Sequence, residues 1–240
     1  MPRHVLITLT NGEKRITKSK KILKKFYNKK KNIKIVIHNS LNKVKEKFFF
    51  LSIIATSSKP RYLIFKNVLS KFKIKNIILE KVIFSNNYQF NTSLELSKKY
   101  LTKIWVNLPR REHQVTSYIK NKLNRKKKIF IEYCASNWGM ASNLIHFMDF
   151  LNWVSKSKKI KVYQNKISKK LYKSKRKGFH EIRGEIVFKD EKENILKVSD
   201  KKNNKKKFLI KNLNNLYKIS DNILQIKKKN SLTIKKKFSS

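Results

Sequence analysis

The chain has 240 residues, enough for one large domain or two modest ones with real hydrophobic cores. Hydrophobic residues make up 40% of it, including 15 Phe and 9 Tyr, which excludes a disordered chain. The net charge of +47 would attract nucleic acid or an anionic membrane surface. The lysines are spread along the whole sequence rather than clustered, however, so a general lysine bias is favoured over a nucleic-acid-binding footprint.

The single cysteine, Cys134, excludes a disulfide within the chain and suits a reducing compartment. The longest apolar run, Phe48–Ala55, is too short to cross a bilayer. The N-terminus lacks the layout of a secretion signal, and the histidines and Cys134 do not have metal-ligand spacing. We therefore expect a cytoplasmic protein without membrane insertion and without a bound metal.

The first forty residues read as strand, turn, helix and strand, at residues 4–9, 10–15, 16–27 and 33–37. That order is how a dinucleotide-binding half begins. A turn that cradles a pyrophosphate uses several glycines, so that the backbone can approach the phosphates closely. The turn at residues 10–15 (TNGEKR) has only Gly12, so it does not match a phosphate-binding loop.

The next stretch, Phe48–Val82, predicts a strand, a helix and a second strand. Phe48–Ala55 and Ile77–Leu79 are continuous apolar runs, as in a buried parallel sheet. The helix between them places one stripe of residues at steps of three and four: Arg61, Ile64, Phe65, Val68, Leu69 and Phe72. A right-handed crossover then brings the polar strand ends, Thr56–Ser58 and Glu80–Lys81, to one edge of the sheet, where open α/β sheets bind ligands.

The remaining segments predict a second domain. A helix is expected at residues 92–100, a strand at 103–106, a basic helix at 118–128, a strand at 129–133 and a helix at 140–154. Short apolar alternations from Glu181 onward predict an antiparallel meander, after a basic link at residues 156–177. The expected division is a Rossmann-like domain at 1–106, an α+β domain with a mostly antiparallel open sheet at 107–228, and a basic tail at 229–240.

The helix at residues 140–154 carries Ser142, His146 and Asp149 at steps of four and three, so their side chains share one face. A histidine between a hydroxyl and a carboxylate can be held in one tautomer and can exchange a proton with a ligand. The alternative is a histidine that only hydrogen-bonds its own helix. From these residues alone, that alternative is the more frequent outcome.

Four segments occur in an order that resembles the Gfo/Idh/MocA oxidoreductases, especially members in bacterial surface-sugar and polysaccharide biosynthesis. They are IIATSS, LEKV, WVNLPRR and SNWGMASNLIHFMD, within Phe48–Gly184. The resemblance implies a Rossmann-like parallel-sheet domain followed by the α+β domain. It also implies an NAD or NADP cofactor, a sugar or sugar-derivative substrate, and a homo-oligomer as a possible assembly.

The resemblance assigns roles residue by residue. The family's Glu-Lys-Pro motif falls on Glu80-Lys81, with Val82 in place of the proline, and its catalytic groups fall on Lys81 and His146. The cofactor would be bound by Ala55, Thr56, Ser57, Ser58, Glu80 and Lys81. The substrate would be bound by Asn107, Arg111 and Asp149.

Three departures from the family pattern leave alternatives open. The glycine-rich turn is missing, Ser142 replaces an aspartate that often precedes the histidine, and the C-terminal part is short. One alternative to an active oxidoreductase is therefore a truncated, catalytically inactive relative with a binding role. A basic nucleic-acid-binding protein is the third and less favoured alternative.

Overall fold

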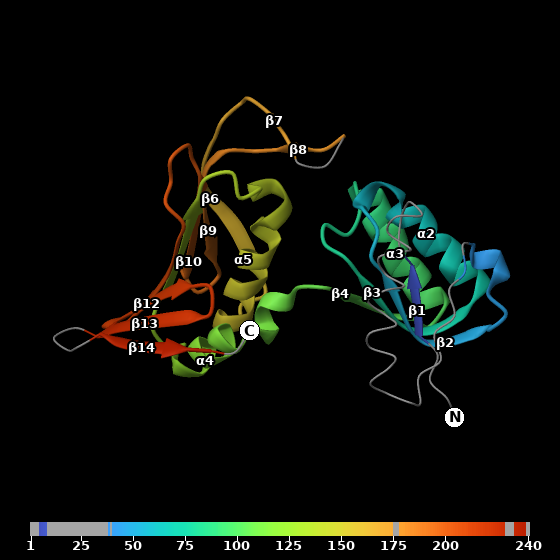
Figure 1. The fold of residues 1–240 in the computed structure, drawn as a ribbon, viewed down its shortest axis with the longest axis horizontal. Coiled ribbons are helices and arrows are strands. Elements are labelled where there is room, and N and C mark those ends of the chain that lie inside the picture. The colour runs from blue at the N-terminus through green and yellow to red at the C-terminus, as the bar shows by residue number, and fades with distance from the viewer. Residues whose placement is uncertain (1–4, 9–37, 39, 175–177, 229–232, 239–240) are drawn as a thin grey trace. The chain divides into compact units, whose positions relative to one another are not determined.

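The computed structural model describes residues 5–8, 38, 40–174, 178–228 and 233–238. The chain divides into two units, Met1–Asn107 and Leu108–Ser240, and Figure 1 labels most of the elements of both. The turn, helix and strand expected at residues 10–15, 16–27 and 33–37 lie outside the described residues.

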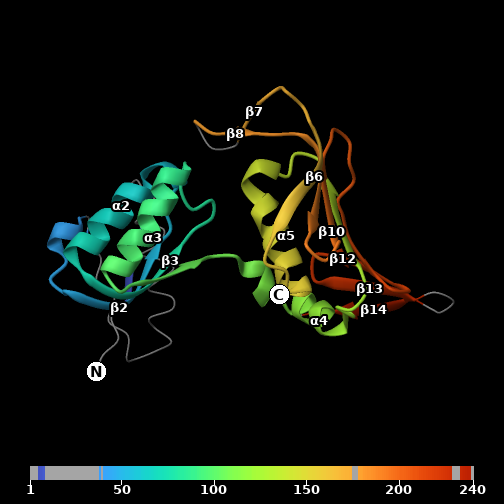
Figure 2. The same cartoon turned by 180° about the vertical axis from the view of Figure 1, so that it is seen from behind.

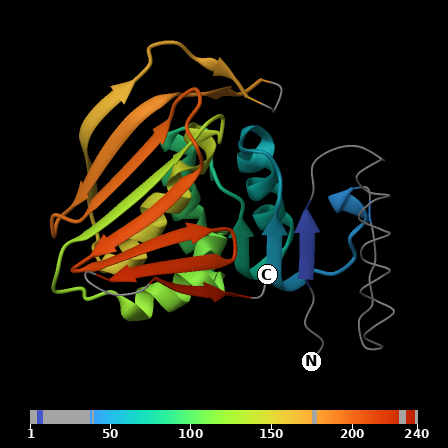
Figure 3. The ribbon, with the colours of Figure 1, turned by 60° about the vertical axis from the view of Figure 1, so that its left-hand side comes forward.

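The described part of the first unit holds a parallel sheet in the order β1-β2-β3-β4. Its strands, which Figure 3 shows from another side, are β1 Val5–Thr8, β2 Phe48–Ile54, β3 Lys73–Leu79 and β4 Lys103–Val106. Helix α2 (Ser58–Lys71) connects β2 to β3, and α3 (Asn87–Lys99) connects β3 to β4, while a short 3-10 turn, η1, covers Leu41–Lys43. The predicted Rossmann-like parallel sheet is confirmed.

The core of this unit lies between α2 and the sheet. The helix buries its apolar stripe, as its three- and four-residue spacing predicts: Tyr62, Phe65, Val68 and Leu69. The sheet contributes Phe49, Ile54, Ile74, Ile77 and Leu79 to the same cluster. Phe84, in the segment after β3, packs edge-on against Tyr62 at 5.7 Å between ring centroids, so this segment is held against α2.

The second unit holds a larger sheet, which in the described residues has the order β14-β13-β12-β11-β5-β10-β9-β6. Its strands are β5 Ile129–Ala135, β6 Ile160–Ile167, β9 Gly184–Asp190, β10 Ile195–Asp200, β11 Lys207–Asn212, β12 Asn215–Ser220, β13 Ile223–Lys228 and β14 Ile234–Lys237. Strands β7 (Tyr172–Lys173) and β8 (His180–Glu181) form a separate hairpin. The helical elements are η2 Pro109–Glu112, α4 Gln114–Lys122 and α5 Met140–Ser155. The predicted mostly antiparallel sheet is confirmed.

The order of strands differs from the expected meander. Strand β5 lies between β10 and β11 and pairs in parallel with β10. It alternates strictly between buried and half-buried positions, as a central strand between two neighbours does. The β9–β10 hairpin and the β11–β14 meander are therefore separated in the sheet by a strand that precedes both in the sequence.

Two segments that were expected to be irregular are strands. The basic link contains β6, which pairs with β9 at the edge of the sheet. Most side chains of β6 are exposed to solvent, so its sequence is polar and lacks the apolar alternation that would predict a strand. Residues 234–237, expected within the basic tail, form β14 and pair with β13. Phe238 follows directly and packs on Tyr118 at 5.6 Å between ring centroids, which anchors this end of the chain to the core.

Helix α5 covers one face of this sheet, as Figures 1 and 2 show from opposite sides. It buries Phe147, Phe150, Leu151 and Val154 against the inward side chains of the strands. Tyr133 stacks on Phe147 at 4.2 Å between ring centroids. Burial raises the pKa of Tyr133, because the phenolate would lose hydration there.

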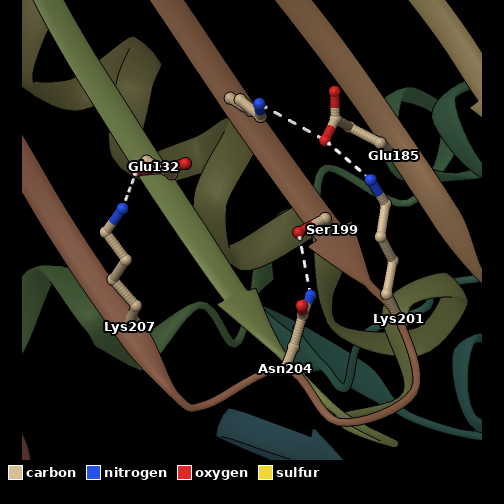
Figure 4. Close-up of polar contacts among 7 residues, drawn as sticks. Glu132, Glu185, Ser199, Lys201, Asn204 and Lys207 are labelled. Atoms are coloured by element: carbon tan, nitrogen blue, oxygen red, sulfur yellow. Dashed lines mark hydrogen bonds and ion pairs between the residues drawn. The ribbon is translucent and has the colours of Figure 1, made fainter.

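The other face of the sheet carries ion pairs (Figure 4). Glu132 binds Lys207 at 2.7 Å, and Glu185 accepts contacts of 3.3 Å from both Lys197 and Lys201. Burial alone would raise the pKa of Glu185, but the two lysine contacts outweigh it and lower the pKa.

Across the described residues, no helix is both long and apolar enough to span a membrane.

Candidate functional site

The carboxyl edge of the parallel sheet brings three strand ends together. Glu80 follows β3 and donates its N–H to the Ile54 carbonyl of β2 at 3.4 Å. Asn107 follows β4, and its N–H donates to the Leu79 carbonyl at 2.8 Å. The Asn107 side-chain amide donates to Glu80 Oε1 at 2.5 Å. Glu80 and Asn107, expected at the cofactor and the substrate, thus bind each other.

The segment after β2 leads straight into α2. Ala55, Ser57 and Ser58 are half-buried, and Thr56 is buried and donates its hydroxyl to the Ser57 carbonyl at 3.2 Å. Ser57 is the N-cap residue of α2, although its side chain makes no capping hydrogen bond. The N–H groups at the start of a helix and its dipole favour a polar or anionic group at this edge.

Arg61 joins the two strand ends, a role that the sequence did not reveal. It is only 1% exposed. Its guanidinium donates to the Thr56 carbonyl after β2, and to the Val82 and Ile83 carbonyls after β3, the last at 2.7 Å. One feature of the sequence pointed to this role: Arg61 is a permanently charged residue in the apolar stripe of a helix. Such a residue is almost never fully buried without partners, so partners for its guanidinium were to be expected.

Lys81 lies in the segment that Arg61 holds. Its side chain is half-buried, and the Lys81–Val82 peptide bond is cis. The neighbouring Glu80 is tied to Asn107, so the two residues of the Glu-Lys pair have different surroundings. The structure therefore brings Thr56, Glu80, Lys81 and Asn107 to one sheet edge, in a backbone that hydrogen bonds hold in place.

In the second unit, Arg111 and Asp149 form a bidentate pair between η2 and α5. Arg111 Nε donates to Asp149 Oδ2 at 2.8 Å, and a terminal guanidinium nitrogen donates to Oδ1. The hydrogen bonds that Arg111 donates to the Asp149 carboxylate raise the pKa of Arg111. The Asp149 side chain is 10% exposed and the Arg111 side chain 42%. These two expected substrate-binding residues thus satisfy each other's charge.

His146 is half-buried on α5, one turn after Ser142 and one turn before Asp149. Ser142 Oγ donates to Glu181 Oε1 at 2.8 Å, and Glu181 Oε2 accepts the Ala141 N–H at 3.0 Å. Glu181 comes from strand β8, 39 residues away in sequence from Ser142. Sequence reasoning missed Glu181, since no local spacing relates it to the His146 face.

Arg110 lies beside this face. Its guanidinium stacks 4.1 Å from the centroid of the Phe147 ring, and burial lowers its pKa. Among the described residues, no cluster of three or more His, Cys, Asp or Glu could hold a metal ion. The hydroxyl, imidazole and carboxylate groups on one face of α5, with a guanidinium of η2 bound to the carboxylate, suit hydrogen bonding and proton transfer with a polyhydroxylated ligand.

The chain has the fold of Gfo/Idh/MocA-type dehydrogenases and oxidoreductases, which are its structural neighbours at low sequence identity. One is a dehydrogenase (MviM) from Clostridium difficile, with a TM-score of 0.69 and 16% identity, covering 98% of this chain and 74% of that one. No protein-family model and no curated protein matches the sequence.

Two further solved structures carry more specific names. UDP-N-acetylglucosamine 3-dehydrogenase GnnA from Acidithiobacillus ferrooxidans has a TM-score of 0.65 and 8% identity, covering 100% of this chain and 84% of that one. An inositol dehydrogenase homolog from Azotobacter vinelandii, complexed with NADH and myo-inositol, has a TM-score of 0.55 and 11% identity. That match covers 79% of this chain and 56% of the other, so this chain spans little more than half of that relative.

Proposed function

We propose that the chain is an NAD(P)-dependent oxidoreductase that acts on a sugar or sugar derivative. The observation that carries the proposal is the carboxyl edge of the parallel sheet, where Arg61 and Asn107 hold the Thr56–Ser58 and Glu80–Lys81 segments together. Structural neighbours include a protein complexed with NADH and myo-inositol and a UDP-N-acetylglucosamine dehydrogenase, which supports this cofactor and substrate class.

The residues at this edge fit a nicotinamide cofactor. Small side chains at Ala55, Ser57 and Ser58 allow close approach, and the N-terminus of α2 begins beside them. Glu80 and Lys81 follow the neighbouring strand and complete the proposed cofactor-binding set together with Thr56. A nicotinamide bound there would accept or return the hydride. The turn at residues 10–15, which would meet the phosphates, lies outside the described residues.

The chain's own groups would handle the proton. Oxidation of a sugar hydroxyl releases one proton along with the hydride, so a basic group must take that proton. Lys81 and His146 are the proposed catalytic residues, because an amine and an imidazole can both bind a hydroxyl and exchange its proton. Asn107, Arg111 and Asp149 are the proposed substrate-binding residues. The observed Arg111–Asp149 pair supports a fixed geometry on the His146 helix.

The proposed biological role is a step of surface polysaccharide biosynthesis in the cytoplasm. The substrate would then be a sugar nucleotide or a related sugar. A homo-oligomer is the assembly that the resemblance implies. Gel filtration with light scattering measures the assembly, and turnover with free and nucleotide-linked sugars separates the substrate classes.

The deciding experiment measures cofactor binding and turnover. Calorimetry with oxidised and reduced NAD and NADP should show saturable binding of at least one form. Turnover with sugars, sugar nucleotides and inositols is then followed through nicotinamide absorbance. Lys81→Ala should leave the far-UV circular dichroism spectrum unchanged and lower kcat by about 10²–10⁴-fold. A chain that binds none of the four nicotinamide forms is not this enzyme.

The second candidate is a catalytically inactive relative that binds a sugar. The observation favouring it is that the turn at residues 10–15 offers only Gly12 for the approach of a pyrophosphate. Saturable sugar binding, unaffected by nicotinamides and without turnover, would select this candidate. Cofactor binding in the same calorimetric experiment would exclude it.

A further inference from the structure

Glu181 links the β7–β8 hairpin to the first turn of α5. One carboxylate oxygen accepts the Ala141 N–H at 3.0 Å and the other accepts the Ser142 hydroxyl at 2.8 Å. The first N–H groups of a helix have no partner inside the helix, and the helix dipole favours a negative charge there. The carboxylate therefore occupies the N-terminus of the helix that carries His146.

The hydrogen bond to Glu181 sets the direction of the Ser142 hydroxyl. A carboxylate only accepts, so the single hydroxyl proton points toward Glu181 Oε1, with the Gly139 carbonyl as its other acceptor at 3.1 Å. The charge-assisted bond is the shorter and stronger of the two. Any further hydrogen bond at Ser142 must then be one that Oγ accepts from another donor.

Gly139 makes this close approach possible. It has a φ of +72°, and a Cβ there would lie 3.1 Å from both Glu181 Oε1 and Ser142 Oγ. Asn143 fixes the same turn, because its amide donates to the Trp138 carbonyl at 2.8 Å. The serine, the carboxylate and the backbone are thus built around one another.

We propose that Glu181 is a positioning residue for His146. Because Glu181 accepts the hydroxyl proton of Ser142, Ser142 Oγ can act toward His146 only as a hydrogen-bond acceptor. Residues four apart on a helix are neighbours on its surface, so Ser142 Oγ is presented on the α5 face next to the His146 side chain. An acceptor at that position favours the tautomer that carries its proton on the facing ring nitrogen.

The inference rests on the proposed function only in that His146 exchanges a proton with the substrate; the hydrogen-bond direction is independent of it. The test therefore combines a spectroscopic measurement with turnover. Glu181→Gln preserves the size of the side chain. The Ala141 N–H can only donate, so the amide oxygen of the new glutamine must face it as the acceptor. The NH₂ group then faces Ser142 Oγ and forces that oxygen to accept from it. Ser142→Ala removes the hydroxyl altogether.

Side-chain ¹H–¹⁵N spectra of the full chain report which imidazole nitrogen of His146 carries the proton, with His146→Gln used to assign the signals. We expect Glu181→Gln and Ser142→Ala each to change the tautomer signals of His146. The double variant should match Ser142→Ala alone. In the turnover assay, each single variant should lower kcat about tenfold or more, the loss of one charged hydrogen bond.

Glu191→Gln is the matched control, since Glu191 also accepts a backbone N–H, that of Lys158 at 3.0 Å. It should leave both readouts unchanged. The inference is overturned if the His146 signals of Glu181→Gln match those of the unmodified chain. It is also overturned if Glu181→Gln has its full effect in the Ser142→Ala background, because Glu181 would then act only through the Ala141 N–H. Changed spectra in a chain without nicotinamide binding would support this inference and reject the proposed function.

Discussion

Arg61, on α2, donates a hydrogen bond of 2.7 Å to the carbonyl of Ile83, in the segment after β3. The same guanidinium donates to the Thr56 carbonyl, in the segment after β2. One buried cation therefore connects the ends of two neighbouring parallel strands, at the edge where the proposed cofactor site lies. The geometry of that edge depends on a side chain that does not belong to the proposed binding set.

Arg61→Met should destabilise the first unit and weaken nicotinamide binding. The substitution leaves the carbonyls of Thr56, Val82 and Ile83 without the donor, and each unsatisfied buried polar group costs about 1–3 kcal/mol. We expect the free energy of opening, measured by hydrogen exchange in α2, to fall by about 3 kcal/mol or more. Lys66→Met, an exposed position on the same helix, is the control and should have little effect. Equal losses in both variants would refute this role for Arg61.

The outcome for α2 and α5 shows what periodicity can and cannot predict. The three- and four-residue spacing located the buried stripe of α2, and it placed Ser142, His146 and Asp149 on one face of α5. It did not locate the residues that α5 buries, such as Phe147, Phe150 and Val154. It placed Arg61 in an apolar stripe without saying what a buried guanidinium contacts. Spacing describes one element, whereas the partners of Arg61 lie on two other segments.

Long-range pairing accounts for the remaining differences. Nothing local in the sequence of β5 says that it separates β10 from β11, because strand order depends on contacts between distant segments. The edge strands β6 and β14 expose nearly all of their side chains, so they lack the alternation that reveals a half-buried strand. Glu181 escaped prediction for the same reason, since its contacts with α5 span about forty residues of sequence.

Asp190 should make the stability of the second unit depend on pH. It is 4% exposed and accepts hydrogen bonds from Ser157 Oγ at 2.6 Å, from the side chain and N–H of Asn194, both at 2.9 Å, and from the Lys192 N–H at 2.8 Å. Burial alone would raise the pKa of Asp190, but these hydrogen bonds outweigh it and lower the pKa below its ordinary 3.8.

The sign follows from this lowered pKa. The folded state favours the ionised carboxylate, so its stabilisation is fully present above the pKa of the unfolded chain and is lost as pH falls through the lower folded value. Asp190→Asn should therefore lower the free energy of unfolding at neutral pH by about 1.5–3 kcal/mol. The difference in this free energy between the unmodified chain and the variant, the gap, should narrow below about pH 4. Urea unfolding of both chains across pH measures this difference. A gap that stays constant in acid would show that packing, and not charge, is responsible. The exposed Asp221→Asn is the control and should have a smaller effect.

Gly184→Ala should detach the edge strand β6. Gly184 has a φ of +131°, and a Cβ there would lie 2.3 Å from the Lys166 carbonyl oxygen on β6. Because that contact is with backbone, relief requires the two strands to separate. We expect a loss of about 3 kcal/mol or more, with faster hydrogen exchange in β6. Lys189→Ala, on the same strand β9, removes an ion pair with Glu193 and a cation–π contact with Tyr163 of β6 but introduces no backbone clash, so it should leave β6 largely protected. Protection of β6 in Gly184→Ala would contradict this prediction.

The Arg111–Asp149 pair should show an asymmetric response to the loss of either partner. Asp149 is the more buried side chain, so Arg111→Ala leaves a carboxylate with little access to water, whereas Asp149→Asn leaves a guanidinium that solvent can reach. We expect Arg111→Ala to be the more destabilising change. A double-mutant cycle should give a coupling of about 1 kcal/mol, which salt reduces because Arg111 is largely solvated.

Arg111→Lys separates charge from geometry in the same pair. Lysine keeps the positive charge but cannot make two parallel hydrogen bonds to the Asp149 carboxylate, so it should recover only part of the coupling. Urea unfolding at low and high salt measures each variant. If Arg111→Lys matches the unmodified chain at both salt concentrations, the bidentate geometry contributes nothing and only the charge matters. If Asp149→Asn proves as damaging as Arg111→Ala, the proposed difference in burial does not control the response.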